Sequence, residues 1–89
     1  MGTTVGSILI SYDVSDKNPE VKTALIALGY VKTWKNTGAP KVYTLPNTTL
    51  WHPSKSSNQG LIDMQSVCTR LKVTLEKAVS VKAIEFVGI

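Results

Sequence analysis

Asp13 is the residue of this chain whose type and position best suit chemistry. It directly follows the apolar run of residues 7–12 and precedes the polar stretch 14–17. This pattern predicts a carboxylate at the end of a core strand, where a rigid scaffold presents side chains to a site. Such a carboxylate can hold a metal ion, act as a base, or hydrogen-bond the following turn. All three interpretations remain open.

His52 and Thr49 are the other candidates for a catalytic role. His52 is the only histidine and could move protons or contact a phosphate, although a solvated loop explains it equally simply. Thr49 could donate a hydrogen bond to a phosphate, or serve only as a strand former. We expect Asp13 to be the central group and the other two to be accessory.

A magnesium ion is the cofactor that fits this arrangement. If two copies of the chain pair, two Asp13 carboxylates can approach each other across the two-fold axis and bind Mg²⁺ with several retained waters. The ion could then activate a water for attack on a phosphodiester. Asp16 is a minor candidate for the same site.

Lysines supply nearly all of the positive charge, and the net charge is +4. Aromatic residues alternate with lysines along a predicted hairpin, which favours contact with nucleic acid, although packing would explain the aromatic residues as well. The single Arg argues against sequence-specific readout. The candidate nucleic-acid contacts are Lys32, Lys35, Lys41 and Lys55.

Length and composition indicate a small globular protein with a single domain. A chain of 89 residues is one domain, with residues 1–6 expected to be disordered. No apolar run reaches the roughly 20 residues that span a bilayer. The only cysteine, Cys68, cannot form an internal disulfide, which fits the cytoplasm, and it reads as a buried apolar side chain. The common zinc, nucleotide and nucleophile motifs are absent.

The elements that position these residues follow the order βαββαβ. Strands are expected at 7–13, 30–35, 41–51 with a bulge at Pro46, and 79–89. The first helix is expected to be capped by Asn18 and to end at Gly29. The second is expected to follow an Asn58 cap for about five turns.

This order predicts a ferredoxin-like α+β fold, with a four-stranded sheet and both helices on one face. We expect the first and third strands to be central and parallel, with the fourth beside the first. Asp13 and the segment 48–52 would then share one edge of the sheet. Leu9, Val87 and one of the tryptophans would lie on the face away from the helices, which we expect to form a homodimer.

One stretch of the chain resembles a known group of proteins: an apolar strand that ends in Tyr12-Asp13, followed by a polar loop and a short helix. It is similar there to the small CRISPR-associated nucleases of spacer acquisition and to the VapD-type toxin ribonucleases. The resemblance implies a ferredoxin-like homodimer, RNA as the favoured nucleic acid, and a metal-binding role near the dimer axis for Asp13. The first helix departs from the family pattern, since it carries Lys22 and no Arg.

Three functions remain open. The first is Mg²⁺-dependent phosphodiester hydrolysis centred on Asp13. The second is a non-catalytic module that binds nucleic acid or another protein. The third is a small-molecule regulatory domain, since this fold hosts many functions.

Overall fold

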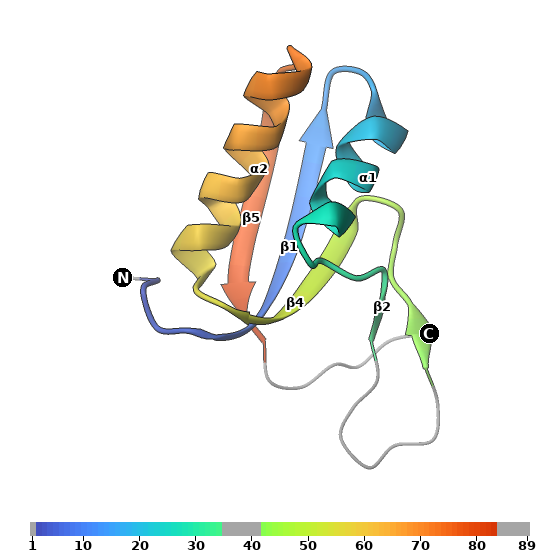
Figure 1. Cartoon of the computed structure of the whole chain (residues 1–89). Helices are drawn as coiled ribbons and strands as arrows, with labels where there is room; N and C mark the ends of the chain where they lie inside the picture. The colour runs from blue at the N-terminus through green and yellow to red at the C-terminus, as the bar shows by residue number, and fades with distance from the viewer. Residues whose placement is uncertain (1, 35–41, 84–89) are drawn as a thin grey trace.

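β1 (Gly6–Val14) is the middle strand of a three-stranded antiparallel sheet, with β4 (Thr49–Lys55) on one side and β5 (Leu75–Lys82) on the other. The helices α1 (Asn18–Ala27) and α2 (Ser57–Leu71) cover one face of this sheet (Figure 1). The computed structural model describes residues 2–34 and 42–83. The fold class is therefore α+β, and the element order is compatible with βαββαβ.

Alternation along β1 decides which side chains enter the core. Ile8, Ile10 and Tyr12 point toward the helices and are at most 4% exposed, as the sequence pattern predicts. Leu50 of β4 pairs with Ile10 and is also fully buried. The helices complete the core with these buried side chains: Val21, Leu25, Met64, Val67 and Cys68.

The predicted second strand, over 30–35, does not join this sheet, so the described sheet has three strands and not four. β2 (Thr33–Trp34) and β3 (Tyr43–Thr44) pair with each other in a separate two-stranded ribbon. Val31 joins this region to the main sheet through a single bridge to Trp51, with N–O distances of 2.8 and 3.0 Å. The predicted hairpin is seen there in part, since Thr44 and Tyr43 pair with Thr33 and Trp34.

The expected parallel arrangement of the first and third strands is wrong. β4 runs antiparallel to β1, with Ile8 opposite His52 and Ser11 opposite Thr49. The crossover through α1 returns the chain parallel to β1, and the predicted hairpin then reverses it, so β4 must run against β1. The placement of the last strand beside β1 is confirmed.

The caps of the helices differ from the predicted ones at two of three ends. Lys17, in the left-handed region, occupies the N-cap of α1 in place of Asn18. Ser56 caps α2 in place of Asn58, and its hydroxyl accepts from the N–H of Gln59 at 3.1 Å. The predicted end of α1 is confirmed: Gly29 has φ +99° and its N–H bonds the Ile26 carbonyl.

The second helix is shorter than the apolar spacing predicts. It ends at Leu71, with Lys72 in the left-handed conformation, and the chain enters β5 at Leu75. The predicted final strand over 79–89 therefore begins earlier, and its residues 84–89 lie outside the described chain. Among the described residues, no helix is long and apolar enough to cross a membrane.

Candidate functional site

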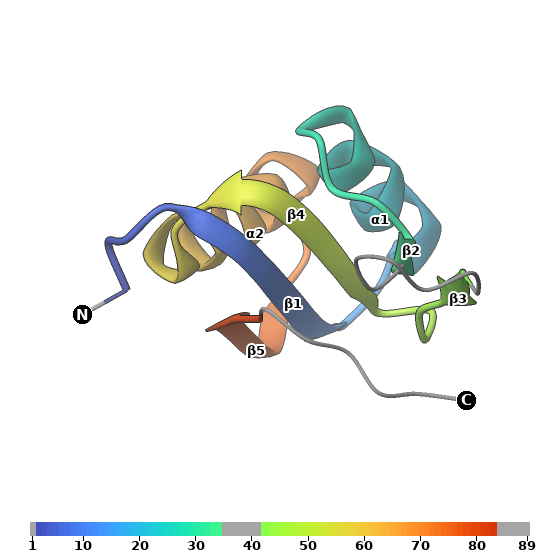
Figure 2. The same cartoon turned by 90° about the horizontal axis from the view of Figure 1, so that it is seen from below.

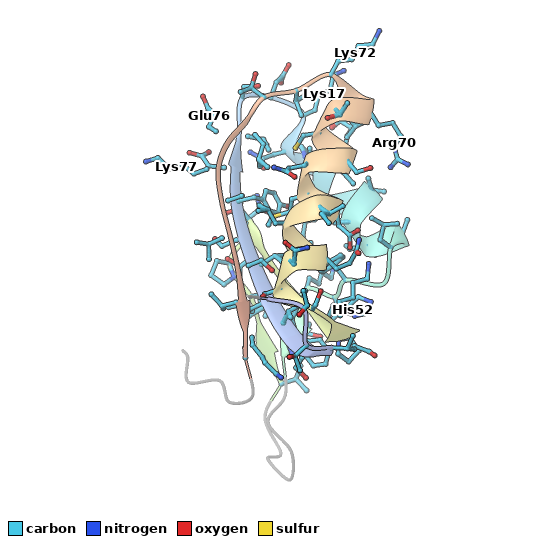
Figure 3. All side chains as sticks on the ribbon, turned by 90° about the vertical axis from the view of Figure 1, so that its left-hand side faces the viewer. Lys17, His52, Arg70, Lys72, Glu76 and Lys77 are labelled. Atoms are coloured by element: carbon cyan, nitrogen blue, oxygen red, sulfur yellow. The ribbon has the colours of Figure 1, made fainter. Side chains whose placement is uncertain are left out.

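Asp13 lies near the end of β1, on the face of the sheet opposite the helices. It is exposed, and its cross-strand neighbour on β5 is Lys77. The two residues border a shallow surface depression of about 260 Å³ that Ser11 and Val79 also line. Figure 3 shows Lys77 and Glu76 projecting from the same end of β5, away from the helices. The register therefore places a lysine directly opposite the carboxylate on the neighbouring strand.

Thr49 lies at the same end of the sheet as Asp13. It pairs with Ser11, and the two hydroxyl oxygens are 3.5 Å apart. The N–H of Tyr12 donates to the carbonyl of Thr48 at 3.1 Å, so the start of β4 runs beside the end of β1. The antiparallel direction thus still brings Asp13 and Thr49 into one neighbourhood.

His52 lies apart from both of these residues. It pairs with Ile8, five residues from Asp13, which corresponds to about 17 Å along a strand. It also faces the helices, whereas Asp13 faces away from them. Because the three candidate catalytic residues occupy two faces and two ends of the sheet, they form no common site within one chain.

Local contacts hold the His52 ring in one orientation. Its Nδ1 accepts from the Ser54 N–H at 3.0 Å, and its ring stands edge-on to Tyr30 with centroids 5.2 Å apart. Gly29 leaves room for it, since a Cβ there would lie 2.7 Å from Nε2. Burial lowers the pKa of His52, with help from the charge of Lys55. Burial therefore disfavours the charged form of the ring, which packs against Tyr30.

A buried polar cluster beside this ring is the main feature that the sequence analysis missed. Asp63, on α2, is 7% exposed and accepts hydrogen bonds from three side chains. The distances are 2.5 Å from Lys55 Nζ, 2.8 Å from the Tyr30 hydroxyl and 2.8 Å from Gln59 Nε2. We call these four residues, Tyr30, Lys55, Gln59 and Asp63, the Asp63 cluster.

The electrostatics of the Asp63 cluster favour an ionised carboxylate. Burial alone would raise the pKa of Asp63, but the hydrogen bonds from its three partners and the charge of Lys55 lower it below its usual value. Burial and the bond to Asp63 raise the pKa of Tyr30 well above its ordinary range. Lys55 Nζ also lies 4.9 Å from the centre of the Tyr30 ring. Each charge has a partner, so removing either member would leave the other partly buried and uncompensated.

Only part of the predicted nucleic-acid surface can be placed. Lys32 is exposed, whereas Lys35 and Lys41 lie outside the described residues. Lys55 is the last residue of β4, and its ammonium group forms an ion pair with Asp63. That ion pair draws Lys55 toward the protein, so its charge is largely compensated before any phosphate approaches.

The face of the sheet away from the helices carries a group of partly exposed apolar side chains that the register places together. Val79 and Val81 are 55% and 44% exposed, and both lie opposite residues of β1. The predicted positions of Leu9 and Trp51 on this face agree with the register, which pairs them with each other. We define the open face by these residues: Leu9, Ser11, Thr49, Trp51, Val79 and Val81.

A metal site within one chain has no support from the described residues. Over residues 2–34 and 42–83, no three His, Cys, Asp or Glu side chains gather to hold an ion. Asp13 offers one carboxylate, so the predicted Mg²⁺ site needs a second copy to supply another. Compared with family models, with curated proteins and with solved structures, the chain matches none of them. The resemblance to the CRISPR-associated and VapD-type nucleases stays a prediction.

Proposed function

We propose that this protein is a non-catalytic interaction module of the ferredoxin-like type that binds another protein through its open face. One observation carries the proposal: Val79 and Val81 stand 55% and 44% exposed on a sheet face that no described helix covers. In Figure 2, α1 and α2 both lie on the other side of β1 and β4. Exposed apolar side chains grouped on one face are typical of a surface that a partner covers.

The charge of this surface favours a protein over a nucleic acid. The charged residues that the register places beside the open face are Asp13 and Lys77, which are opposite in sign. Binding of a phosphate backbone depends on an excess of positive charge that releases counterions. The pair gives no such excess, whereas an apolar face with balanced charges suits a protein surface.

Site-specific photo-crosslinking in the source cells tests the proposal. A photoreactive residue at Val81 is expected to give a discrete protein adduct, identified by mass spectrometry. The matched control carries the same residue at Thr23, exposed on α1. Equal adducts from both positions, or adducts only to nucleic acid, would contradict a protein-binding open face.

A second candidate function is Mg²⁺-dependent cleavage of RNA or DNA. Asp13 is exposed at the end of β1 with Thr49 nearby, which is the observation that favours it. In that case Asp13 would bind Mg²⁺ together with a carboxylate of a second copy, and the ion would supply an activated water. Cleavage of single- and double-stranded substrates by the wild type, lost in Asp13→Ala, would support it. The absence of cleavage by either chain would rule it out.

A further inference from the structure

We propose that His52 is a pH-sensitive latch, which holds the segment after α1 against β4 and releases it when the ring takes up a proton. We call this segment, residues 28–32, the α1–β2 connection. The proposal goes beyond both proposed functions, because it depends on contacts on the helix side of the sheet, where Figure 3 shows His52, and not on what the open face binds.

The first step is that His52 lies beside three consecutive residues of the α1–β2 connection. A Cβ built on Gly29 would lie 2.7 Å from the Nε2 of His52, so the ring passes close to the backbone there. Tyr30 meets the ring edge-on, with centroids 5.2 Å apart. Val31 exchanges two backbone hydrogen bonds with Trp51, the residue before His52, at 2.8 and 3.0 Å. The ring is therefore part of the contact between this connection and β4.

The second step is the position of the proton on the ring. The Nδ1 of His52 accepts a hydrogen bond from the N–H of Ser54 at 3.0 Å. An acceptor nitrogen carries no proton, so the neutral ring carries its proton on Nε2, the nitrogen that faces Gly29. A further proton has to enter at Nδ1. There it would point at the Ser54 N–H, and the hydrogen bond would be replaced by two donors that face each other.

The third step is the charge that each neighbouring element presents to the ring. On β4, Lys55 places its ammonium group 4.9 Å from the centre of the Tyr30 ring. On α2, the carboxylate of Asp63 accepts hydrogen bonds from three side chains, with Lys55 as its ion-pair partner. Tyr30 itself stays neutral, because burial and its bond to Asp63 raise its pKa. On β1, the residue opposite the ring is the apolar Ile8. Asp63 is therefore occupied by three donors before the ring could gain a charge.

The pKa of His52 agrees with this geometry, since it is lowered in the folded chain. Burial is the largest cause, and the charge of Lys55 adds to it. The charge of Asp63 and a backbone hydrogen bond with Leu28 act in the opposite direction without cancelling these effects. A group whose pKa is lowered in the folded state destabilises that state when it is protonated. Acid therefore favours a conformation in which the ring is free of these contacts.

The fourth step is what the release of the ring would uncover. Val31 meets the outer side of β4 at an isolated bridge to Trp51. On its other side β4 is held by a ladder to β1 that runs from Gly6 to Ser11, so the three-stranded sheet does not depend on this bridge. Opening of the α1–β2 connection would leave that sheet intact and free the outer backbone N–H and C=O of Trp51. The latch thus controls access to this margin of the sheet.

The size of the effect follows from the protonation of one imidazole. In the open conformation the ring would titrate at its ordinary pKa of 6.5, whereas in the closed conformation it resists protonation. Closure is therefore most stable above pH 6.5 and weakens as the pH falls. Between pH 7.5 and pH 5.0 the ratio of open to closed molecules rises by at most about 30-fold. The rise is smaller if the closed form also takes up protons in this range.

Residue-resolved amide hydrogen exchange tests the proposal on the wild type. From pH 7.5 to pH 5.0, with intrinsic rates corrected, the protection of the Val31 and Trp51 amides is expected to fall by about ten- to thirtyfold. Low urea concentrations should leave their exchange almost unchanged, because a local opening exposes little surface. The Val81 amide in the β1–β5 ladder is the matched control, and its protection should fall steeply with urea. One protection factor and one urea dependence for all three amides would mean that only global unfolding frees the ring, which refutes the latch.

A titration and one substitution link the opening to His52. The ring nitrogens of this single histidine and the amide of Ser54 should titrate in NMR spectra with one common midpoint below pH 6.5. His52→Gln carries a neutral side chain, so in that variant the protection of Val31 and Trp51 should not vary with pH over this range. Separate midpoints for the ring and Ser54, or a pH dependence that survives His52→Gln, would overturn the proposal. The titration needs no substitution, so it decides the question even if the variant does not fold.

Discussion

The hydroxyl of Tyr30 donates a 2.8 Å hydrogen bond to the carboxylate of Asp63, across 33 residues of sequence. It ties the segment that follows α1 to the middle of α2. Tyr30 is 1% exposed, and this bond satisfies its hydroxyl away from bulk water. The contact fixes the position of the ring against which His52 packs, and it makes Asp63 a structural acid.

Asp63→Ala should lower the free energy of unfolding by about 3 kcal/mol, because it leaves the partly buried ammonium of Lys55 without its counter-charge. Urea denaturation followed by circular dichroism gives the value. Asp16→Ala, which removes an exposed carboxylate, is the matched control and should cost under about 1 kcal/mol. Equal losses for the two variants would contradict a special role for the cluster.

Tyr30→Phe should cost about 1–2 kcal/mol, because it removes a donor from a buried carboxylate. Tyr12→Phe offers a control of identical chemistry. The Tyr12 hydroxyl is buried without a hydrogen-bond partner among the described residues, and burial raises the pKa of Tyr12 to about 12. Its removal should be neutral or stabilising. Thermal unfolding of both variants side by side would show whether the ranking holds.

Stability should fall in two stages as the solution is acidified. The pKa of His52 is lower in the folded chain than its ordinary 6.5, so below that pH the unfolded chain takes up the proton more readily and stability declines. The pKa of Asp63 is also lowered, so its contribution is present above 3.8 and is lost as the pH falls through the folded-state value. The pH dependence of the urea midpoint measures both stages. His52→Gln should abolish the first stage and leave the second.

Gly60→Ala should destabilise the fold by about 1–3 kcal/mol through overpacking. A Cβ at Gly60 would lie 2.3 Å from the Ser80 hydroxyl oxygen and 2.9 Å from Ile8 Cδ1. Ser80→Gly removes the closest of these atoms, so the double variant should recover part of the loss. If Gly60→Ala proves as stable as the wild type, α2 does not approach the sheet as closely as described.

β1 and the end of α1 could be predicted from sequence because their signals are local. Alternating apolar residues mark the strand at Ile8, Ile10 and Tyr12, and a glycine marks the left-handed position at Gly29. The end of α2 carries no such signal. Leu71, Leu75 and Ala78 continue the helical spacing by coincidence, and the stop is a lysine in the left-handed conformation. Long-range contacts such as the Ser15 N–H to the Thr74 carbonyl settle that boundary.

The Asp63 cluster escaped prediction for a related reason. Met64 and Cys68 lie on the apolar side of α2, and an acid next to Met64 in sequence is typical of the solvated side of a helix. Gln59 and Asp63, four residues apart, were the available hint, since such a pair can hydrogen-bond along a helix. The buried partner, Tyr30, comes from another part of the chain, and only the tertiary structure brings it there.

The two margins of the sheet are unequal, and this limits how the protein can assemble. Val31 occupies the outer side of β4 at Trp51 with a reciprocal pair of backbone hydrogen bonds, so that margin is already blunted. Among the described residues, β5 has neither a strand nor a bridge on its outer side, so any strand that joined this sheet would meet its outward backbone groups there.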